Sequence, residues 1–226
     1  MSSASSLAPR PLSPGTARVV EEMVVMLGEM DLHEVHAGDL ARRAGVAIPT
    51  VYYNFRSMAD IIVEATVIML HRFVDPFFDA LHEMSRALDD GDAARFRVAS
   101  GRFLDLCWSR EVNEEVHRLA PLIAHVRQVA PRDVRLREIQ AREVGLLVDA
   151  LRAAQSRGWI SPDDDATAFA VVHYTCVLAQ AVFWHPAFGR LTTIDFSGPV
   201  GRLRYQTRLH DDIREFPVRD LEPDAR

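Results

Sequence analysis

The sequence predicts an all-α protein, and three observations carry this prediction. Apolar residues recur at the three- and four-residue spacing of one helix face. No stretch shows the sustained apolar–polar alternation with turn residues that is typical of β-hairpins. Capping and helix-ending residues divide the chain into segments of helical length. The 226 residues, 48% hydrophobic and 26% charged, are typical of a folded globular protein with one large domain or two small ones.

The first predicted helix follows a polar arm. Residues 1–13 are rich in Ser, Pro and Ala, and they lack the cationic start and apolar core of a signal peptide. We therefore expect a flexible arm over 1–13. Val20, Val24, Leu27 and Met30 then form one stripe, which predicts a helix from about 15 to 31.

Two short helices are predicted next, on either side of Gly45. Leu40 and Ala44 indicate the first, and Val51 and Phe55 the second. A tight turn between helices needs a residue that tolerates positive φ, and Gly45 supplies it. We expect the apolar residues of the second helix to close a small core with the helix at 15–31. This is the layout of a helix-turn-helix, whose second helix lies in the major groove of DNA.

The later helices are marked by caps and breakers. Ser57 and Asp60 form a capping-box pattern before a long helix, in which Pro76 predicts a bend. Further helices are expected at about 93–109, 111–128 and 133–157, the last ended by Gly158. The next should begin at Ser161-Pro162-Asp163 and be buried on all sides, because 166–184 carries no charged residue. A loop at 186–199, a helix at 200–215 and a polar tail at 217–226 complete the prediction.

Charge and cysteine content exclude several classes of protein. The net charge of −6, with Arg as every one of the 26 basic residues, excludes a globally basic nucleic-acid coat and a polybasic membrane binder. Residues 40–59 nevertheless hold three Arg and no acid, whereas 14–60 hold four Arg and seven acids, a balance of −3. Cys107 and Cys176 are too few for a disulfide framework, so we expect reduced, buried thiols and a cytoplasmic protein.

The predicted helix-turn-helix carries groups suited to a DNA duplex. Hydroxyl and amide side chains that reach phosphates or base edges occur at Thr50, Tyr52, Tyr53 and Asn54. Arg42, Arg43 and Arg56 flank them. The alternative, three packed helices without a DNA role, would leave the tyrosine pair exposed beside arginine for no purpose.

The segment LARRAGVAIPTVYYNFRSMADII resembles the DNA-binding segment of the TetR family of bacterial regulators. The resemblance covers about residues 15–65 and rests on Leu40, Ala41, Ala44, Gly45, Val46, Thr50, Val51, Tyr52, Tyr53, Phe55, Ser57, Asp60 and Ile61. Ala47, Pro49 and Met58 depart from the family's usual Ser, Gly and Lys. These departures remove a helix cap, a backbone N–H and a phosphate contact.

The resemblance implies a DNA-binding domain over 14–60 and a helical ligand-binding and dimerisation domain over 61–216. It implies a homodimeric repressor that binds a palindromic DNA operator and is released by a small-molecule effector. Thr50 and Asn54 would contact phosphates, the two tyrosines would face bases or backbone, and Ile48 and Pro49 would lie near base edges.

The C-terminal region offers candidate residues for the ligand and the dimer, although side chains like the ligand candidates are more often plain core. Ligand candidates are Phe73, Phe77, Phe103, Trp108, Leu122, His125, Leu147, Phe169, Val172 and His173. Candidates for the dimer interface are Ala170, Val177, Ala181, Trp184, Leu203, Gln206 and His210.

No enzyme motif stands against this interpretation. Glu114-x-x-His117 is half of a di-iron signature, and Asp79-x-x-His82 is a faint partner, so a solvated helix face is the simpler explanation. We expect no catalytic site, metal, cofactor or membrane partner. The alternative function is a helical small-molecule-binding protein without DNA binding, which the acidic balance of 14–60 favours.

Overall fold

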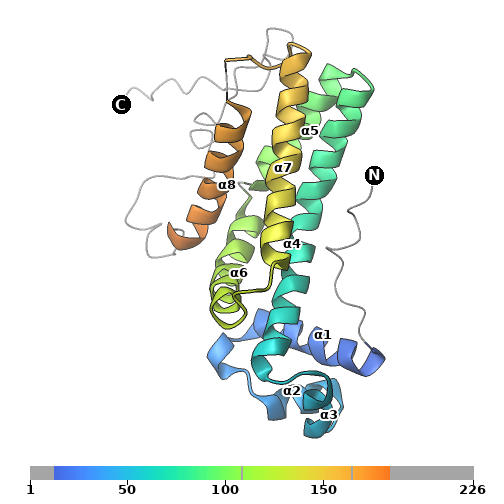
Figure 1. The fold of residues 1–226 in the computed structure, drawn as a ribbon, viewed down its shortest axis with the longest axis vertical. Helices are drawn as coiled ribbons and strands as arrows, with labels where there is room; N and C mark the ends of the chain where they lie inside the picture. Colours follow the sequence, from blue (N-terminus) through green and yellow to red (C-terminus); the bar gives the residue numbers. More distant parts are fainter. Residues whose placement is uncertain (1–12, 108, 164, 184–226) are drawn as a thin grey trace, which may run out of the picture. The chain divides into compact units, whose positions relative to one another are not determined.

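The computed structural model describes residues 13–107, 109–163 and 165–183, and every regular element within them is a helix (Figure 1). The predicted all-α class, with a helix-turn-helix domain before a larger helical region, is confirmed. The elements are α1 (Pro14–Glu29), the 3-10 helix η1 (Leu32–Glu34), α2 (Ala37–Ala44), α3 (Ile48–Asn54), α4 (Met58–Asp89), α5 (Ala93–Cys107), α6 (Arg110–Val129), α7 (Arg135–Ser156) and α8 (Ala166–Phe183). Within the described ranges, no helix has both the length and the apolarity to cross a membrane.

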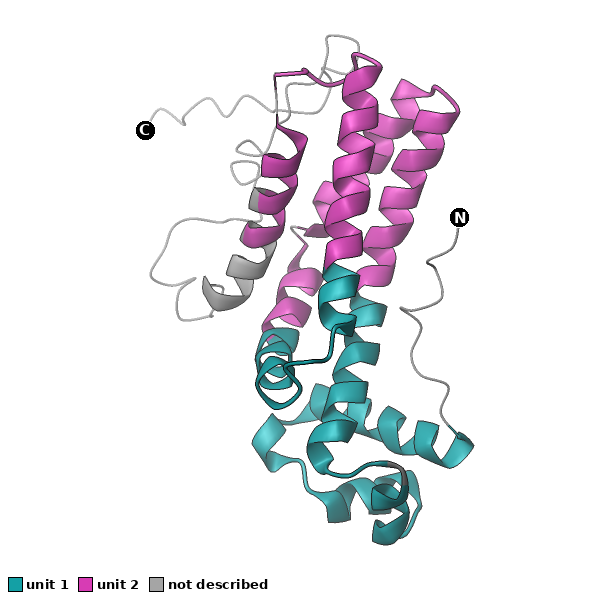
Figure 2. Cartoon of the chain, viewed as in Figure 1, with its two compact units in different colours: residues 1–73, 118–140 teal, residues 74–117, 141–226 magenta. Residues whose placement is uncertain are grey.

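The chain forms two compact units whose boundaries fall inside helices (Figure 2). Unit 1 comprises Met1–Phe73 and Arg118–Gln140, and unit 2 comprises Val74–His117 and Ala141–Arg226. The sequence-based division at 60/61 differs from this one, because the core of unit 1 continues beyond the three N-terminal helices. It takes Ile61, Ile62, Ala65 and Met69 from α4 and Leu119 and Leu122 from α6.

The first helix supplies one wall of the unit 1 core. Ser13 caps α1 by accepting a hydrogen bond from the Thr16 backbone N–H at 3.3 Å, and Pro14 occupies the first turn. The apolar stripe of α1 is buried at Val19, Val20, Met23, Met26 and Leu27. Val51 of α3 and Phe55, which follows α3, are buried in the same cluster, which confirms the expected small core.

The turn between α2 and α3 has the geometry that the sequence predicted for Gly45. Gly45 has φ 66°, a left-handed conformation that favours glycine. Its N–H donates to the Arg42 carbonyl at 3.3 Å, and the Val46 N–H donates to the Ala41 carbonyl at 3.0 Å. Arg18 of α1 donates to the Ala44 carbonyl at 2.8 Å, which ties the turn to α1.

The capping box before α4 is also confirmed. The Asp60 carboxylate accepts from the Ser57 N–H at 3.1 Å, and the Ser57 hydroxyl oxygen accepts from the Asp60 N–H at 3.3 Å. The helix continues through Pro76 to Asp89. Arg135, at the start of α7, donates to both oxygens of Glu64 on α4 at 2.8 and 2.9 Å, and it also pairs with Asp133. This ion-pair cluster fixes α7 to α4 within unit 1.

One expectation about α8 is wrong. The helix begins at Ala166, not at Ser161-Pro162-Asp163, because Asp165 caps it by accepting from the Thr167 and Ala168 N–H groups at 2.8 and 3.0 Å. The Ser161 hydroxyl oxygen instead accepts locally from the Asp163 N–H at 3.2 Å. Burial is one-sided in the single chain: His173 is buried whereas Val171 is 50% exposed. The expected loop at 186–199 and helix at 200–215 lie outside the described residues.

Candidate nucleic-acid interface and a buried polar cluster

The third helix is held by one face and exposed on the other. It begins after Ala47, whose methyl side chain makes no capping hydrogen bond, and Pro49 occupies its first turn. Val51 and Phe55 anchor it in the unit 1 core. The other residues of this helix whose side chains are described, at 48–50, 52 and 53, are all exposed. In Figure 1, α3 lies beside α2, below α1 in this view.

The outer face of α3 carries an unusual amount of exposed apolar and aromatic surface. Ile48 is 49%, Tyr52 42% and Tyr53 86% exposed. Ile48 and Tyr52 are four residues apart, so they share one ridge of the helix. Pro49, Thr50 and Arg56 are exposed as well, while the side chain of Asn54 lies outside the described part. The predicted interface residues of α3 that the structure describes are thus accessible to a ligand.

Two of the three predicted arginines are engaged by acids. Arg42 lies 2.5 Å from Asp39, and Arg43 lies 2.7 Å from Glu29. The local balance of +3 counted over 40–59 therefore overstates the positive charge available to a ligand. Asp39 could have been found from its i, i+3 spacing to Arg42 on α2. Glu29 could not, because it lies on another helix, 14 residues away in the chain.

Several predicted ligand residues meet in the core of unit 2. The Phe103 ring is 6.1 Å from that of Phe77 and 5.4 Å from that of His173, and Phe169 stacks on His173 at 5.9 Å. The His173 Nε2 atom lies 3.1 Å from the Cys107 Sγ atom. Burial lowers the pKa of His173 to about 4, so its imidazole is neutral at pH 7.

Buried polar groups that sequence reasoning missed belong to the same unit. Burial raises the pKa of Glu143 on α7 to about 7. Burial, and secondarily the charge of Glu143, raises the pKa of the Cys107 thiol. Asn113 on α6 is 1% exposed, and neither atom of its amide has a partner among the described residues. No short motif marks Asn113 or Glu143, because their burial depends on helix packing.

The other ligand candidates are dispersed. Phe73 and Leu122 pack in the unit 1 core, and Leu147 is buried in unit 2. His125 in unit 1 is half-buried, and its Nε2 atom has no partner among the described residues. Trp108 lies outside the described residues, as does the side chain of Val172.

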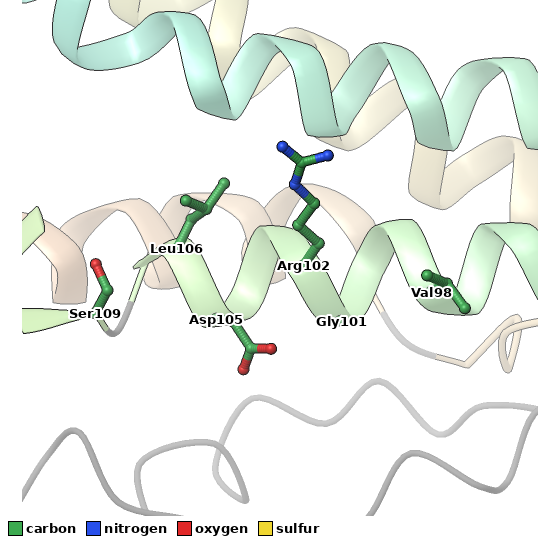
Figure 3. Close-up of a pocket in the computed structure, with 6 residues that line it drawn as sticks. All are labelled: Val98, Gly101, Arg102, Asp105, Leu106 and Ser109. Carbon is green, nitrogen blue, oxygen red and sulfur yellow. The ribbon is translucent and has the colours of Figure 1, made fainter.

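An open groove of about 520 Å³ lies elsewhere in unit 2, along α5. Its lining residues are Val98, Gly101, Arg102, Asp105, Leu106 and Ser109 (Figure 3). Arg102 and Leu106 point to one side of α5 and Asp105 to the other (Figure 3). No residue predicted to bind ligand lines this groove.

The dimer candidates are only partly visible. Ala170 is fully buried within its own chain, so α8 presents Val171 rather than Ala170 at its surface. Val177 and Ala181 lie on α8, but their side chains are outside the described part. Trp184, Leu203, Gln206 and His210 lie outside the described residues.

A sequence model of a known family matches the segment that builds this interface. The model, described as "Bacterial regulatory proteins, tetR family", matches residues 24–65, from the middle of α1 to the beginning of α4. Residues 24–65 therefore form a DNA-binding domain of the TetR type. The chain is a DNA-binding transcriptional regulator of helix-turn-helix type. The matched segment includes α2, α3 and the whole exposed surface described above.

Solved structures resemble the chain over most of its length. A protein with unknown function from Rhodococcus sp. RHA1 is 17% identical, with a TM-score of 0.55 over 87% of this chain and 96% of that one. This likeness shows a shared fold. The ketosteroid transcriptional regulator KstR2 of Mycobacterium tuberculosis is 17% identical, with a TM-score of 0.49 over 88% of this chain and 94% of that one. NalD, the secondary repressor of the MexAB-OprM multidrug efflux pump in Pseudomonas aeruginosa, is 17% identical. Its TM-score is 0.47, over 86% of this chain and 96% of that one. No curated protein matches the chain.

Proposed function

We propose that this TetR-family protein is a cytoplasmic repressor that binds a palindromic operator as a homodimer and leaves it when a small-molecule effector binds. The observation that carries the proposal is the outer face of α3, where Ile48, Tyr52 and Tyr53 are exposed within the family's matched segment. A helix-turn-helix places such a face in the major groove, and two copies about 34–36 Å apart read successive grooves of one duplex face.

The tyrosines provide the direct test of this interface. Tyr52→Ala and Tyr53→Ala should each weaken binding to the protein's own upstream DNA by about tenfold or more, since each removes an aromatic side chain and a hydroxyl from the contact. Val25→Ala is the matched control, because Val25 is similarly exposed (42%) but lies on α1 outside the interface. Mobility-shift titrations with variants of unchanged melting temperature measure the effect. Equal binding by all three variants would show that α3 is not the contact surface.

The effector site is proposed for unit 2. Support comes from the meeting of Phe77, Phe103, Phe169 and His173, which combines aromatic walls with a neutral imidazole. A thermal-shift screen against hydrophobic metabolites would identify binders. Phe103→Ala and His173→Ala should abolish the shift caused by a binder, whereas Val98→Ala on the outer groove of α5 should not.

Effector and operator affinities are proposed to be coupled through α4, a single helix with residues in both units. A ligand that favours a different tilt of α4 would change the distance between the two copies of α3. A coupling free energy of about 1–3 kcal/mol gives a 5- to 150-fold loss of operator affinity. The test is titration of the operator duplex with and without a binder from the screen. An unchanged dissociation constant would refute the coupling.

Dimerisation is proposed to involve α8, whose Val171 and Thr175 side chains are exposed in the single chain. We expect a dimer at micromolar concentration in sedimentation equilibrium, and a stable monomer would remove the operator mechanism.

A helical small-molecule-binding protein without DNA binding is the second candidate. The pairing of Arg42 with Asp39 and of Arg43 with Glu29 favours it, since these pairs weaken attraction to phosphate. Effector binding without any sequence-specific DNA binding would establish it.

A further inference from the structure

The first turn of α3 exposes the aliphatic side chain of Ile48, which is not needed to anchor the helix in the core. Ile48 is the first residue of the helix and is 49% exposed, although the anchoring of α3 is accomplished by Val51 and Phe55. Eight large hydrophobic residues in the described part of the chain are 42% exposed or more, and three of them lie on α3, which has only seven residues. Such a concentration of apolar surface marks a contact site.

The two chain neighbours of Ile48 carry no side-chain group for polar readout of bases. Ala47 has a methyl side chain, and Pro49 has neither a donor in its side chain nor a backbone N–H. The Thr50 N–H is occupied by the Ala47 carbonyl at 2.9 Å, as is the Val51 N–H at 3.4 Å. The beginning of the helix therefore meets a DNA groove with an apolar surface.

The major groove offers one apolar group to such a surface. Each base pair exposes hydrogen-bonding atoms there, and thymine alone adds a 5-methyl group. An isoleucine side chain placed against N7, O6 or an amino group would displace water without replacing its hydrogen bonds, which is unfavourable. Against a methyl group, the same side chain buries apolar surface on both partners.

We propose that Ile48 determines operator specificity by contacting the 5-methyl group of one thymine in each half-site. This inference rests on the proposed function, in which α3 enters the major groove. It makes Ile48 a specificity-determining residue, whereas Tyr52 and Tyr53 add affinity through their rings and hydroxyls.

The experiment uses the full chain and a duplex that the wild-type protein selects from a randomised DNA library. Each thymine of the selected site is replaced in turn by deoxyuridine, which removes the methyl group and leaves the other groove atoms unchanged. The wild type should lose affinity about fourfold at one thymine per half-site, the factor that corresponds to burial of one methyl-sized group. Replacing both symmetric thymines should cause a loss of about 15-fold.

The variants decide whether Ile48 makes the contact. Ile48→Ala should bind the thymine and deoxyuridine duplexes equally, whereas Val25→Ala should keep the full methyl effect. Ile48→Asn should select adenine at the same position, because an asparagine amide pairs with the adenine edge. Both Ile48 variants should melt at the wild-type temperature, since the side chain is half exposed.

Two results would overturn the inference, and they differ from failure of the proposed function. If every thymine tolerates deoxyuridine, or if Ile48→Ala keeps the methyl effect, the inference fails while operator binding stands. If the library yields no selected sequence, the proposed function fails and the inference fails with it.

Discussion

The ion pair between Glu29 and Arg43 makes a quantitative prediction about DNA binding. The Arg43 Nη1 atom donates to the Glu29 Oε2 atom at 2.7 Å, and the side chains are 34% and 50% exposed. To contact a phosphate, Arg43 must leave this carboxylate. Exposed ion pairs of this kind contribute about 0.2–1 kcal/mol. Glu29→Gln removes that competition and should raise operator affinity about 1.4- to 5-fold.

Salt dependence separates this effect from a general change of charge. Each additional neutralised phosphate steepens the slope of log K against log salt by about 0.9. Glu29→Gln should therefore steepen the slope by up to about 0.9 between 50 and 200 mM salt, measured by fluorescence anisotropy.

Glu21→Gln is the matched control for this substitution. It removes the same charge from the same helix, and Glu21 pairs at 2.6 Å with Arg72 rather than with an interface residue. Glu21 lies eight residues before Glu29, about 12 Å along the helix and beyond the screening length of about 10 Å at 0.1 M salt. Its affinity and slope should match the wild type. If both variants gained affinity equally, Arg43 would not be a phosphate contact limited by Glu29.

Three further predictions concern stability in urea. Folding raises the pKa of Glu143 from 4.5 to about 7, so its contribution to the free energy of unfolding should fall as the pH rises from 4.5 to 7. Folding lowers the pKa of His173 from 6.5 to about 4, so its contribution should rise as the pH rises from 4 to 6.5. The free energy of unfolding of the wild type should therefore change little with pH in this range. That of Glu143→Gln should rise with pH and that of His173→Gln should fall, each by about 3 kcal/mol. Parallel pH profiles of the two variants would refute the opposite effects of these groups. Arg135→Met should lower the free energy of unfolding by about 2–4 kcal/mol, because it strands the half-buried Glu64 and Asp133 carboxylates, and a loss below 1 kcal/mol would contradict this. Gly45→Ala should lower it by about 1–2 kcal/mol, since alanine is strained at φ 66°, with unchanged stability as the contrary result.

Local signals in the sequence were sufficient for the helices and for the turn of the interface. Gly45 and the Ser57–Asp60 box act through backbone groups within five residues, so their spacing alone predicts them. Three consecutive aspartates before α8 offered several possible caps, and the sequence could not tell that Asp165 is the one used.

Long-range packing limited the rest. Cys107 and His173 are in contact although they lie 66 residues apart in the chain, and Glu29 and Arg43 pair across two different helices. Nothing in a short window encodes such contacts. The exposed face of α3 could be expected from its buried residues, but the neutralisation of Arg43 could not, since it depends on Glu29 from α1.

The shared core of unit 1 has a consequence for protein engineering. Leu119 and Leu122, more than fifty residues beyond the family's matched segment, complete the packing around α1 and the beginning of α4. A fragment cut after residue 60 would lack these side chains and would expose apolar residues of the unit 1 core to water. Transferring this DNA-binding domain to another protein therefore requires the first turns of α4 and a substitute for α6. A chimera joined at residue 60 should aggregate, whereas one that transplants both pieces should fold.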